Sequence, residues 1–130
     1  MSLSLTLHLP ATPTRPAGCL EFHNDGQYWF LHPWFETIAH RTGKYIDLYG
    51  DVILARDDFS LLRTMFRDAR KRLSTQPAAF EVCVGRQTHP TVGDLYRTVQ
   101  KAELTALLDQ FEALVEEAER EGGWIECLGD

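Results

Sequence analysis

The sequence has no long hydrophobic run, and this limits where the protein is expected to reside. No apolar stretch approaches the ~20 residues that a membrane-spanning helix needs. The N-terminal residues, MSLSLTLHLP, contain neither the basic start nor the continuous apolar segment of a secretory signal peptide. We therefore expect a cytoplasmic protein that does not associate with membranes.

Cysteine is scarce, and its spacing matches no metal-binding pattern. Cys19, Cys83 and Cys127 are odd in number and widely separated, and no CxxC pair occurs. A locally built zinc ribbon or thioredoxin-type motif is thereby excluded. We interpret all three as buried free thiols in strand-like segments, since free Cys is among the most buried residue types.

The familiar catalytic signatures are also missing. The sequence contains no GxGxxG, GxxxxGK[ST], GxSxG or HExxH motif, which removes the recognisable enzyme classes but not every enzyme. His32, Glu36 and His40 follow one another at helical steps of four, so neighbouring members could chelate a metal. All three cannot meet one ion, because eight helical residues rise ~12 Å. We interpret them as a solvated polar face and predict no metal and no cofactor.

Basic residues are outnumbered, since 13 Lys and Arg face 19 Asp and Glu and give a net charge of −6. This balance disfavours nucleic-acid binding, which depends on Lys and Arg against phosphate. The charges are segregated, with a basic block at 56–72 and an acidic block at 103–121. We predict a basic stripe on the first block, either solvated and neutralised by the acidic block or open to an acidic or phosphate-bearing partner: Arg63, Arg67, Arg70 and Lys71.

The hydrophobic patterns predict an α+β fold in one domain covering residues 1–130. Period-two alternation predicts strands at 3–9, 19–23, 80–84 and 124–128, and 95–99 is a further strand or the start of the next helix. Apolar spacing of three and four predicts three helices, over 33–41, 59–73 and 104–118. Interleaved in this order, they favour a four- or five-stranded mixed or antiparallel sheet, with three helices packed mainly on one face.

The stretch YWFLHPWF (28–35) concentrates more than a third of the chain's Phe, Trp and Tyr in eight residues. Large aromatic residues fill cores, and they also anchor binding surfaces. Residues 28–49 hold seven aromatic side chains, more than one helix face can bury, so we expect two or three to reach the surface. The following run, YIDLYGD (45–51), places two Asp four residues apart, which is ordinary turn chemistry or, alternatively, a carboxylate pair for acid–base work.

These observations leave three functions open. The first is a small acidic protein–protein interaction module without catalytic activity; one specific form is a bacterial immunity protein that blocks a toxin domain with a basic cleft. The second is a small-molecule-binding protein or small enzyme with an aromatic pocket around residues 28–49. The third, nucleic-acid binding, is disfavoured by the charge. For the first function we expect a protein partner with a basic surface, or self-association. The residues that we predict to bind a partner or ligand are Tyr28, Trp29, His32, Tyr45, Asp47, Tyr49 and Asp51.

Overall fold

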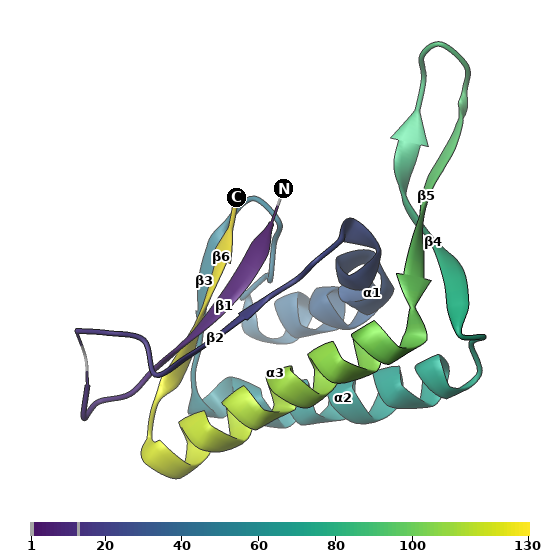
Figure 1. Cartoon of the computed structure of the whole chain (residues 1–130). Helices are drawn as coiled ribbons and strands as arrows, with labels where there is room; N and C mark the ends of the chain where they lie inside the picture. The colour runs from purple at the N-terminus through teal and green to yellow at the C-terminus, as the bar shows by residue number, and fades with distance from the viewer. Residues whose placement is uncertain (1, 13) are drawn as a thin grey trace.

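A computed structural model describes residues 2–12 and 14–130 and confirms the predicted α+β class, with three helices and two antiparallel sheets (Figure 1). Along the chain the elements are β1 (Leu3–His8), β2 (Gly18–Glu21), α1 (Asp25–Thr42), β3 (Asp51–Leu54), a 3-10 turn (Arg56–Asp58), α2 (Phe59–Ser74), β4 (Ala79–Gln87), β5 (Gly93–Gln100), α3 (Lys101–Glu121) and β6 (Trp124–Gly129). The segment 95–99, for which two structures were open, belongs to a strand.

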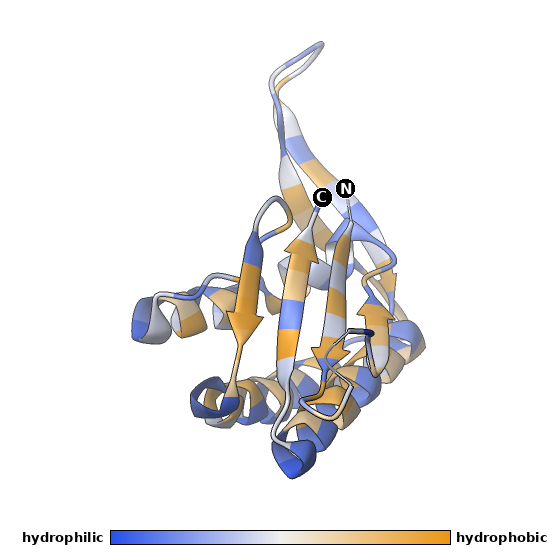
Figure 2. Cartoon of the chain, turned by 90° about the vertical axis from the view of Figure 1, so that its left-hand side faces the viewer, coloured by the Kyte–Doolittle hydropathy of each residue, from blue (hydrophilic) through white to orange (hydrophobic). Residues whose placement is uncertain are grey.

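The larger sheet has four strands in the order β2-β1-β6-β3, and every neighbouring pair is antiparallel. Alternate residues of β1 are fully buried, namely Leu3, Leu5 and Leu7, as the leucine alternation predicts. They join Ile125 and Cys127 of β6 in the core beneath the helices. The helices lie on one side of this sheet, and no helix or strand of residues 2–12 and 14–130 covers its other face (Figure 2). The arrangement is a two-layer sandwich of helices on a sheet.

The second sheet is the β4–β5 hairpin, whose two strands pair only with each other. At its base Phe80 and Val99 face each other across the hairpin, and both are buried. The ring of Phe80 lies 5.6 Å from that of Phe30 on α1, which fixes the base of the hairpin to the helical layer. The distal half of the hairpin projects away from the rest of the molecule (Figure 1).

Helix α1 begins eight residues earlier than the sequence predicts, so the prediction of a start at Pro33 is wrong. The segment NDG (24–26) predicts a turn, because Asn and Asp tolerate left-handed backbone and Gly prefers it. Asn24 is instead the N-cap, and its Oδ1 accepts a hydrogen bond from the amide of Gln27 at 3.1 Å. Pro33 lies inside the helix and removes one backbone donor. Burial of Tyr28 and Leu31 before the proline holds the first turns in place. The helix ends as predicted, at Gly43 with φ 76°.

Helices α2 and α3 confirm the predicted apolar faces, with one difference at the start of α2. Asp57 and Asp58, which directly precede the apolar periodicity, are predicted N-terminal caps. Asp58 does occupy the N-cap position, but its carboxylate makes no capping hydrogen bond to α2 and instead accepts from the amide of Ala55 at 2.8 Å. The ammonium of Lys44 donates to the same carboxylate at 2.7 Å. Because Asp58 is only 3% exposed, these two donors are what make its burial tolerable.

The prediction of three buried cysteines is correct for Cys127 and wrong for the other two. Cys19 on β2 and Cys83 on β4 are exposed, since each lies on a strand face that no helix covers. Burial raises the pKa of the Cys127 thiol to about 12, with a smaller contribution from the neighbouring Glu126 carboxylate.

Candidate functional site

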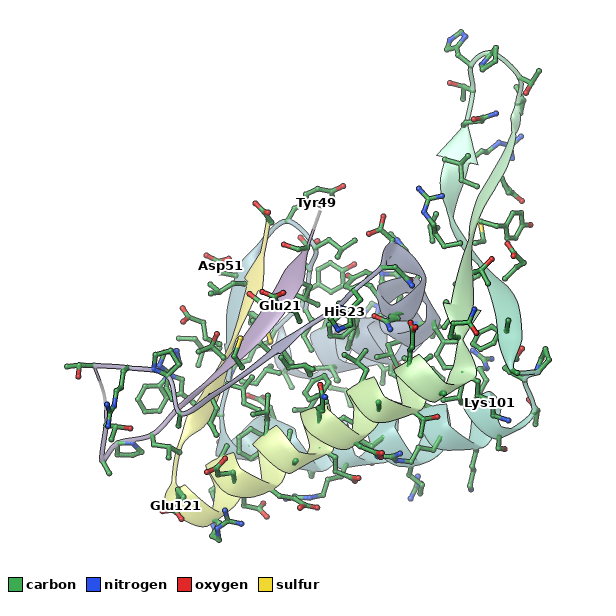
Figure 3. The ribbon with its side chains drawn as sticks, in the orientation of Figure 1. Glu21, His23, Tyr49, Asp51, Lys101 and Glu121 are labelled. Carbon is green, nitrogen blue, oxygen red and sulfur yellow. The ribbon has the colours of Figure 1, made fainter. Side chains whose placement is uncertain are left out.

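The uncovered face of the four-stranded sheet is built from alternate residues of all four strands, which the pairing register arranges in rows. The first row crosses the sheet from Glu21 through Ser4 and Leu128 to Asp51. None of these four side chains is buried. Figure 3 shows Asp51 and Tyr49 at the end of the sheet where the two termini lie, and Glu121 at the opposite end.

Two further rows complete this surface, which we call the open face. The second row is Cys19, Thr6, Glu126 and Ile53, and its last side chain is 50% exposed. The third is formed by His8 and Trp124, which face each other on β1 and β6. The open face therefore comprises Ser4, Thr6, His8, Cys19, Glu21, Asp51, Ile53, Trp124, Glu126 and Leu128.

The electrostatic character of the open face is one-sided. It contains three carboxylates, those of Glu21, Asp51 and Glu126, and β1, β2, β3 and β6 include no Lys or Arg at all. The basic residues of the chain belong to the helices, the hairpin and the connecting segments. An acidic surface with apolar and aromatic side chains among its charges is complementary to a basic protein surface.

His8 and Trp124 form the aromatic end of the open face. Their rings are stacked, with centroids 5.6 Å apart and an interplanar angle of 15°. His8 Nε2 also lies 3.1 Å from Glu126 Oε1, so the imidazole is held by a carboxylate as well as by the indole. Sequence reasoning missed this site, because it depends on β1 and β6 being neighbours. The available signal was the absence of Lys and Arg from the three strands of this sheet that the sequence predicts, at 3–9, 19–23 and 124–128; the fourth, β3, was not predicted as a strand.

The predicted aromatic cluster forms a hydrogen-bonded chain between α1 and the following loop. The buried hydroxyl of Tyr28 donates to the carbonyl of Ile46 at 2.7 Å and lies 3.2 Å from the hydroxyl of Tyr45. His32 Nε2 lies 2.8 Å from that same Tyr45 hydroxyl, and its Nδ1 lies 3.3 Å from Glu36 Oε1. The structure thus joins three of the predicted candidates and adds a carboxylate to them.

This environment changes the acidity of Tyr28. Burial is the main cause that raises the pKa of its phenol above the usual range. The hydrogen bond to Tyr45 and the charges of Asp47 and Glu36 act in the same direction. Tyr28 is therefore a structural donor, whereas the Tyr45 ring is 38% exposed to solvent.

The other four predicted candidates differ from one another in burial and in position. Trp29 is half-buried and its ring lies 4.6 Å from that of His32, so it packs on the hydrogen-bonded chain. Asp47 performs the predicted turn chemistry, since its Oδ1 accepts from the amide of Tyr49 at 3.2 Å. Tyr49 is 68% exposed, and Asp51 lies on the open face. Of the seven aromatic residues in 28–49, two are thus exposed, as the prediction requires.

Two hollows of the molecule lie beside α1. One lies between α1 and α2 and is lined by residues such as Trp34, Ile38 and Met65. Another, of about 310 Å³, lies between α1 and the base of the hairpin, with Trp29 and Phe80 in its walls. Neither includes Tyr45, Asp47 or Tyr49 in its lining.

The predicted basic stripe is largely neutralised by the acidic helix, which is the simpler of the two predicted interpretations. Arg63 pairs with Glu119 of α3, and Arg67 pairs with the adjacent Asp68. The guanidinium of Arg70 contacts two carboxylates of α3, Asp109 at 2.9 Å and Glu112 at 3.0 Å. Lys71 is exposed. Because α2 and α3 satisfy each other's charges, the stripe is a weak candidate for binding phosphate.

Among the described residues, no helix has the length and hydropathy that a membrane span requires. Within residues 2–12 and 14–130, no three His, Cys, Asp or Glu side chains come close enough together to hold a metal ion. His32 and Glu36 make a pair, and His40 is exposed on the next turn of the helix.

No protein-family model matches the chain, and no significant match is found among the curated proteins or the solved structures.

Proposed function

We propose that this protein is a protein-binding module without catalytic activity of its own, and that its partner presents a basic surface to the open face. The observation that carries the proposal is the combination of three carboxylates, no Lys or Arg, and a stacked His8–Trp124 pair on an uncovered sheet. Aromatic anchors surrounded by complementary charge are the usual basis of fast and specific protein association.

An immunity-type inhibitor is the specific form that fits this surface. Toxins that act on nucleic acid have basic clefts, and an acidic inhibitor is drawn to such a cleft by long-range attraction. The net charge of −6 supports this form.

The test is a comparison of two charge-reversal variants with equal net charge. Glu21→Lys with Asp51→Lys changes the two ends of the first row, where both side chains are exposed. Glu103→Lys with Glu116→Lys makes the same change in net charge on exposed positions of α3. Each protein, shown by circular dichroism to be folded, is used for affinity purification from the source organism with quantitative mass spectrometry.

We expect one stoichiometric basic partner to be captured by the unchanged protein and by the α3 variant, and lost by the open-face variant. Binding should weaken as salt is raised, since the attraction is between surface charges. Equal capture by all three proteins would refute the role of the open face. If none of them captures a partner, the interaction function itself is refuted.

A second candidate function is based on the chain Glu36–His32–Tyr45. A carboxylate that orients an imidazole beside a hydroxyl is the arrangement that activates a nucleophile in many enzymes. A tyrosine-reactive sulfonyl fluoride tests it: activation predicts that Tyr45 is labelled faster than the more exposed Tyr49, and that His32→Gln removes the difference. Slower labelling of Tyr45 than of Tyr49 would refute the enzyme function.

A further inference from the structure

The outer edge of β3 carries backbone groups that point away from the rest of the sheet. β3 is the last strand in the order β2-β1-β6-β3, so β6 lies along one of its edges and the other is the outer edge (Figure 2). The amide of Gly129 on β6 donates to the opposing carbonyl of Gly50 at 2.9 Å. Because bonding alternates along an antiparallel pair, every second residue from Gly50 bonds to β6, whereas the N–H and C=O groups of Asp51 and Ile53 point outward.

The chain supplies partners for the amides on either side of this edge but not for those within it. The flanking amides of Tyr49 and Ala55 donate to nearby aspartate carboxylates, at 3.2 and 2.8 Å. Among the described residues, no group accepts from the amides of Asp51 and Ile53, and no strand other than β6 pairs with β3. These two residues therefore offer a row of backbone donors and acceptors, which is what an added strand requires.

β3 lacks most of the features that protect edge strands from pairing with other chains. Such strands are commonly interrupted by Lys, Pro or a bulge. The sequence DVIL contains neither Lys nor Pro, and its pairing with β6 shows no irregularity. Its length of four residues is the remaining protection, so an added strand must be held by side chains as well as by backbone.

The side chains along this edge specify the chemistry of such a strand. Tyr49, Asp51 and Ile53 follow one another at every second position, and all are exposed, the tyrosine by 68% and the isoleucine by 50%. Figure 3 shows Tyr49 and Asp51 at the same end of the sheet. In an added strand, the residues opposite Asp51 and Ile53 are two positions apart and lie on the open face. The complement is a basic residue against Asp51 and an apolar one against Ile53.

The opposite edge of the sheet, on β2, is the weaker candidate. The amide of Phe22 donates to the carbonyl of Leu3 on β1, so by the same alternation Cys19 and Glu21 direct their backbone groups outward. The four residues of β2 include one carboxylate but no exposed large hydrophobic side chain, because the leucine among them is buried. Glu21 therefore provides a control position for the charge of Asp51.

We propose that the partner of the open face adds a strand to β3, through an extended segment in which a Lys or Arg lies two residues from an apolar residue. The inference rests on the proposed function and names the part of the basic partner that this surface recognises. The segment 45–54 includes two acids and no Lys or Arg, which selects a basic strand. A second copy of this chain fits less well, because two molecules of net charge −6 repel each other.

A peptide of defined sequence tests the proposal on the whole protein. The probe is Thr-Arg-Thr-Ile-Thr-Arg-Thr, blocked at both ends, in which an arginine lies two residues from the isoleucine in either strand direction. The matched control has glutamate in place of both arginines. We expect the basic peptide to bind and the acidic peptide not to bind, in titrations followed by NMR of the isotope-labelled protein.

Amide hydrogen exchange distinguishes strand addition from binding by side chains alone. In the free protein, the amides of Asp51 and Ile53 should exchange faster than those of Val52 and Leu54, which bond to β6. Near saturation, the basic peptide should slow exchange of the first two amides by about tenfold. Exchange at Val52 and Leu54 should change much less.

Two substitutions of Ile53 separate the backbone from the side chain. Ile53→Ala removes the apolar contact, and Ile53→Pro also removes the outward N–H, which β6 does not use and which an edge strand can lose. We expect the proline variant to bind the peptide about tenfold more weakly than the alanine variant. Circular dichroism shows whether each variant is folded. If the proline variant is not, the exchange measurement on the unchanged protein decides.

A pair of charge reversals tests which edge is used. Asp51→Lys should abolish binding of the basic peptide, whereas Glu21→Lys makes the same change in net charge on β2 and should retain most of it. Equal losses in these two variants would overturn the proposal, because the outer edge of β3 would then have no special role.

Other results would also overturn it. One is peptide binding with equal losses in both Ile53 variants and unchanged exchange at Asp51 and Ile53; the open face would then bind by side chains alone, and the proposed function would stand. Another is protection of these amides in the protein alone that disappears on dilution, which would place a second copy at the edge. The third is no binding of the basic peptide, after which partner capture decides the proposed function separately.

Discussion

Gly129 and Asp47 lie so close together that no side chain fits between them. A Cβ built on Gly129 would lie 2.5 Å from the carbonyl oxygen of Asp47, and the amide of Gly129 donates to the carbonyl of Gly50 at 2.9 Å. The last strand of the sheet therefore fixes the loop that presents Tyr49.

Replacing this glycine should destabilise the protein. Gly129→Ala forces the backbone of the 47–50 loop away from β6, and we expect the free energy of unfolding to fall by about 1–3 kcal/mol. Gly85→Ala is the control, since a Cβ there meets nothing within 4 Å, and it should be neutral or slightly stabilising. Urea denaturation measures both; equal stability of the two variants would contradict the close contact.

The Tyr28 hydroxyl should contribute more to stability than that of Tyr45. Tyr28→Phe leaves the buried carbonyl of Ile46 without its 2.7 Å donor, and we expect a loss of about 1–3 kcal/mol. Tyr45→Phe removes a hydroxyl on a ring that water reaches, so its loss should be smaller. Chemical denaturation of the two variants at neutral pH compares them, and a larger loss for Tyr45→Phe would disprove this ranking.

Stability should decline in alkali because of Cys127. Its pKa is about 12 in the folded protein against 9.0 for an unperturbed thiol, so the folded state keeps a proton that the unfolded chain releases. The contribution is complete below pH 9 and is lost as pH rises toward 12, at up to about 1.4 kcal/mol per pH unit. Tyr28, whose pKa is also raised, adds to this decline at higher pH.

Urea denaturation at several pH values between 8 and 10 measures the effect of the Cys127 thiol on stability separately from that of the Tyr28 phenol. Cys127→Ala should be less stable at neutral pH, because it leaves a small cavity, but its stability should depend less on pH above 9. An unchanged pH dependence in this variant would show that Cys127 is not the group responsible.

The ion pairs between α2 and α3 should matter little for stability. Arg70→Met removes the contacts to Asp109 and Glu112, and because these groups are partly solvated we expect a loss of at most about 1 kcal/mol. The loss should shrink in ~1 M salt, which screens exposed charges. Lys71→Met, an exposed position one residue further along the helix, is the control. A loss well above this value would mean that the network is less solvated than its exposure indicates.

Local structure was predictable from the sequence wherever one periodicity dominated. Leucines at every second position of 3–9 and apolar residues at steps of three and four in 59–73 and 104–118 each imply one structure. The start of α1 was missed, because Asn24 serves equally well in a turn and as an N-cap, and only the burial of Tyr28 selects the second. The exposure of Cys19 was missed because which face of β2 is covered depends on the helices.

The open face could not be predicted, because its rows exist only once the order of the strands is known. His8 and Glu126, which are in hydrogen-bond contact, are 118 residues apart in the chain. No local pattern specifies that β1 lies between β2 and β6. The grouping of side chains within residues 28–49 was easier to predict. Tyr28, His32 and Tyr45 are close enough in sequence for one helix and one loop to bring them together.

The central position of β1 has a consequence for how the chain is made. β1 and β2 are synthesised before the other strands and helices described here, but the second neighbour of β1 is β6, which is synthesised after all of them. Until then Leu3, Leu5 and Leu7 lack the strand that completes their layer. Closing so long a loop is slow, because its entropy is lost before the contacts form. We expect the four-stranded sheet to stay incomplete until β6 has been released, and the nascent chain to rely on chaperones until then.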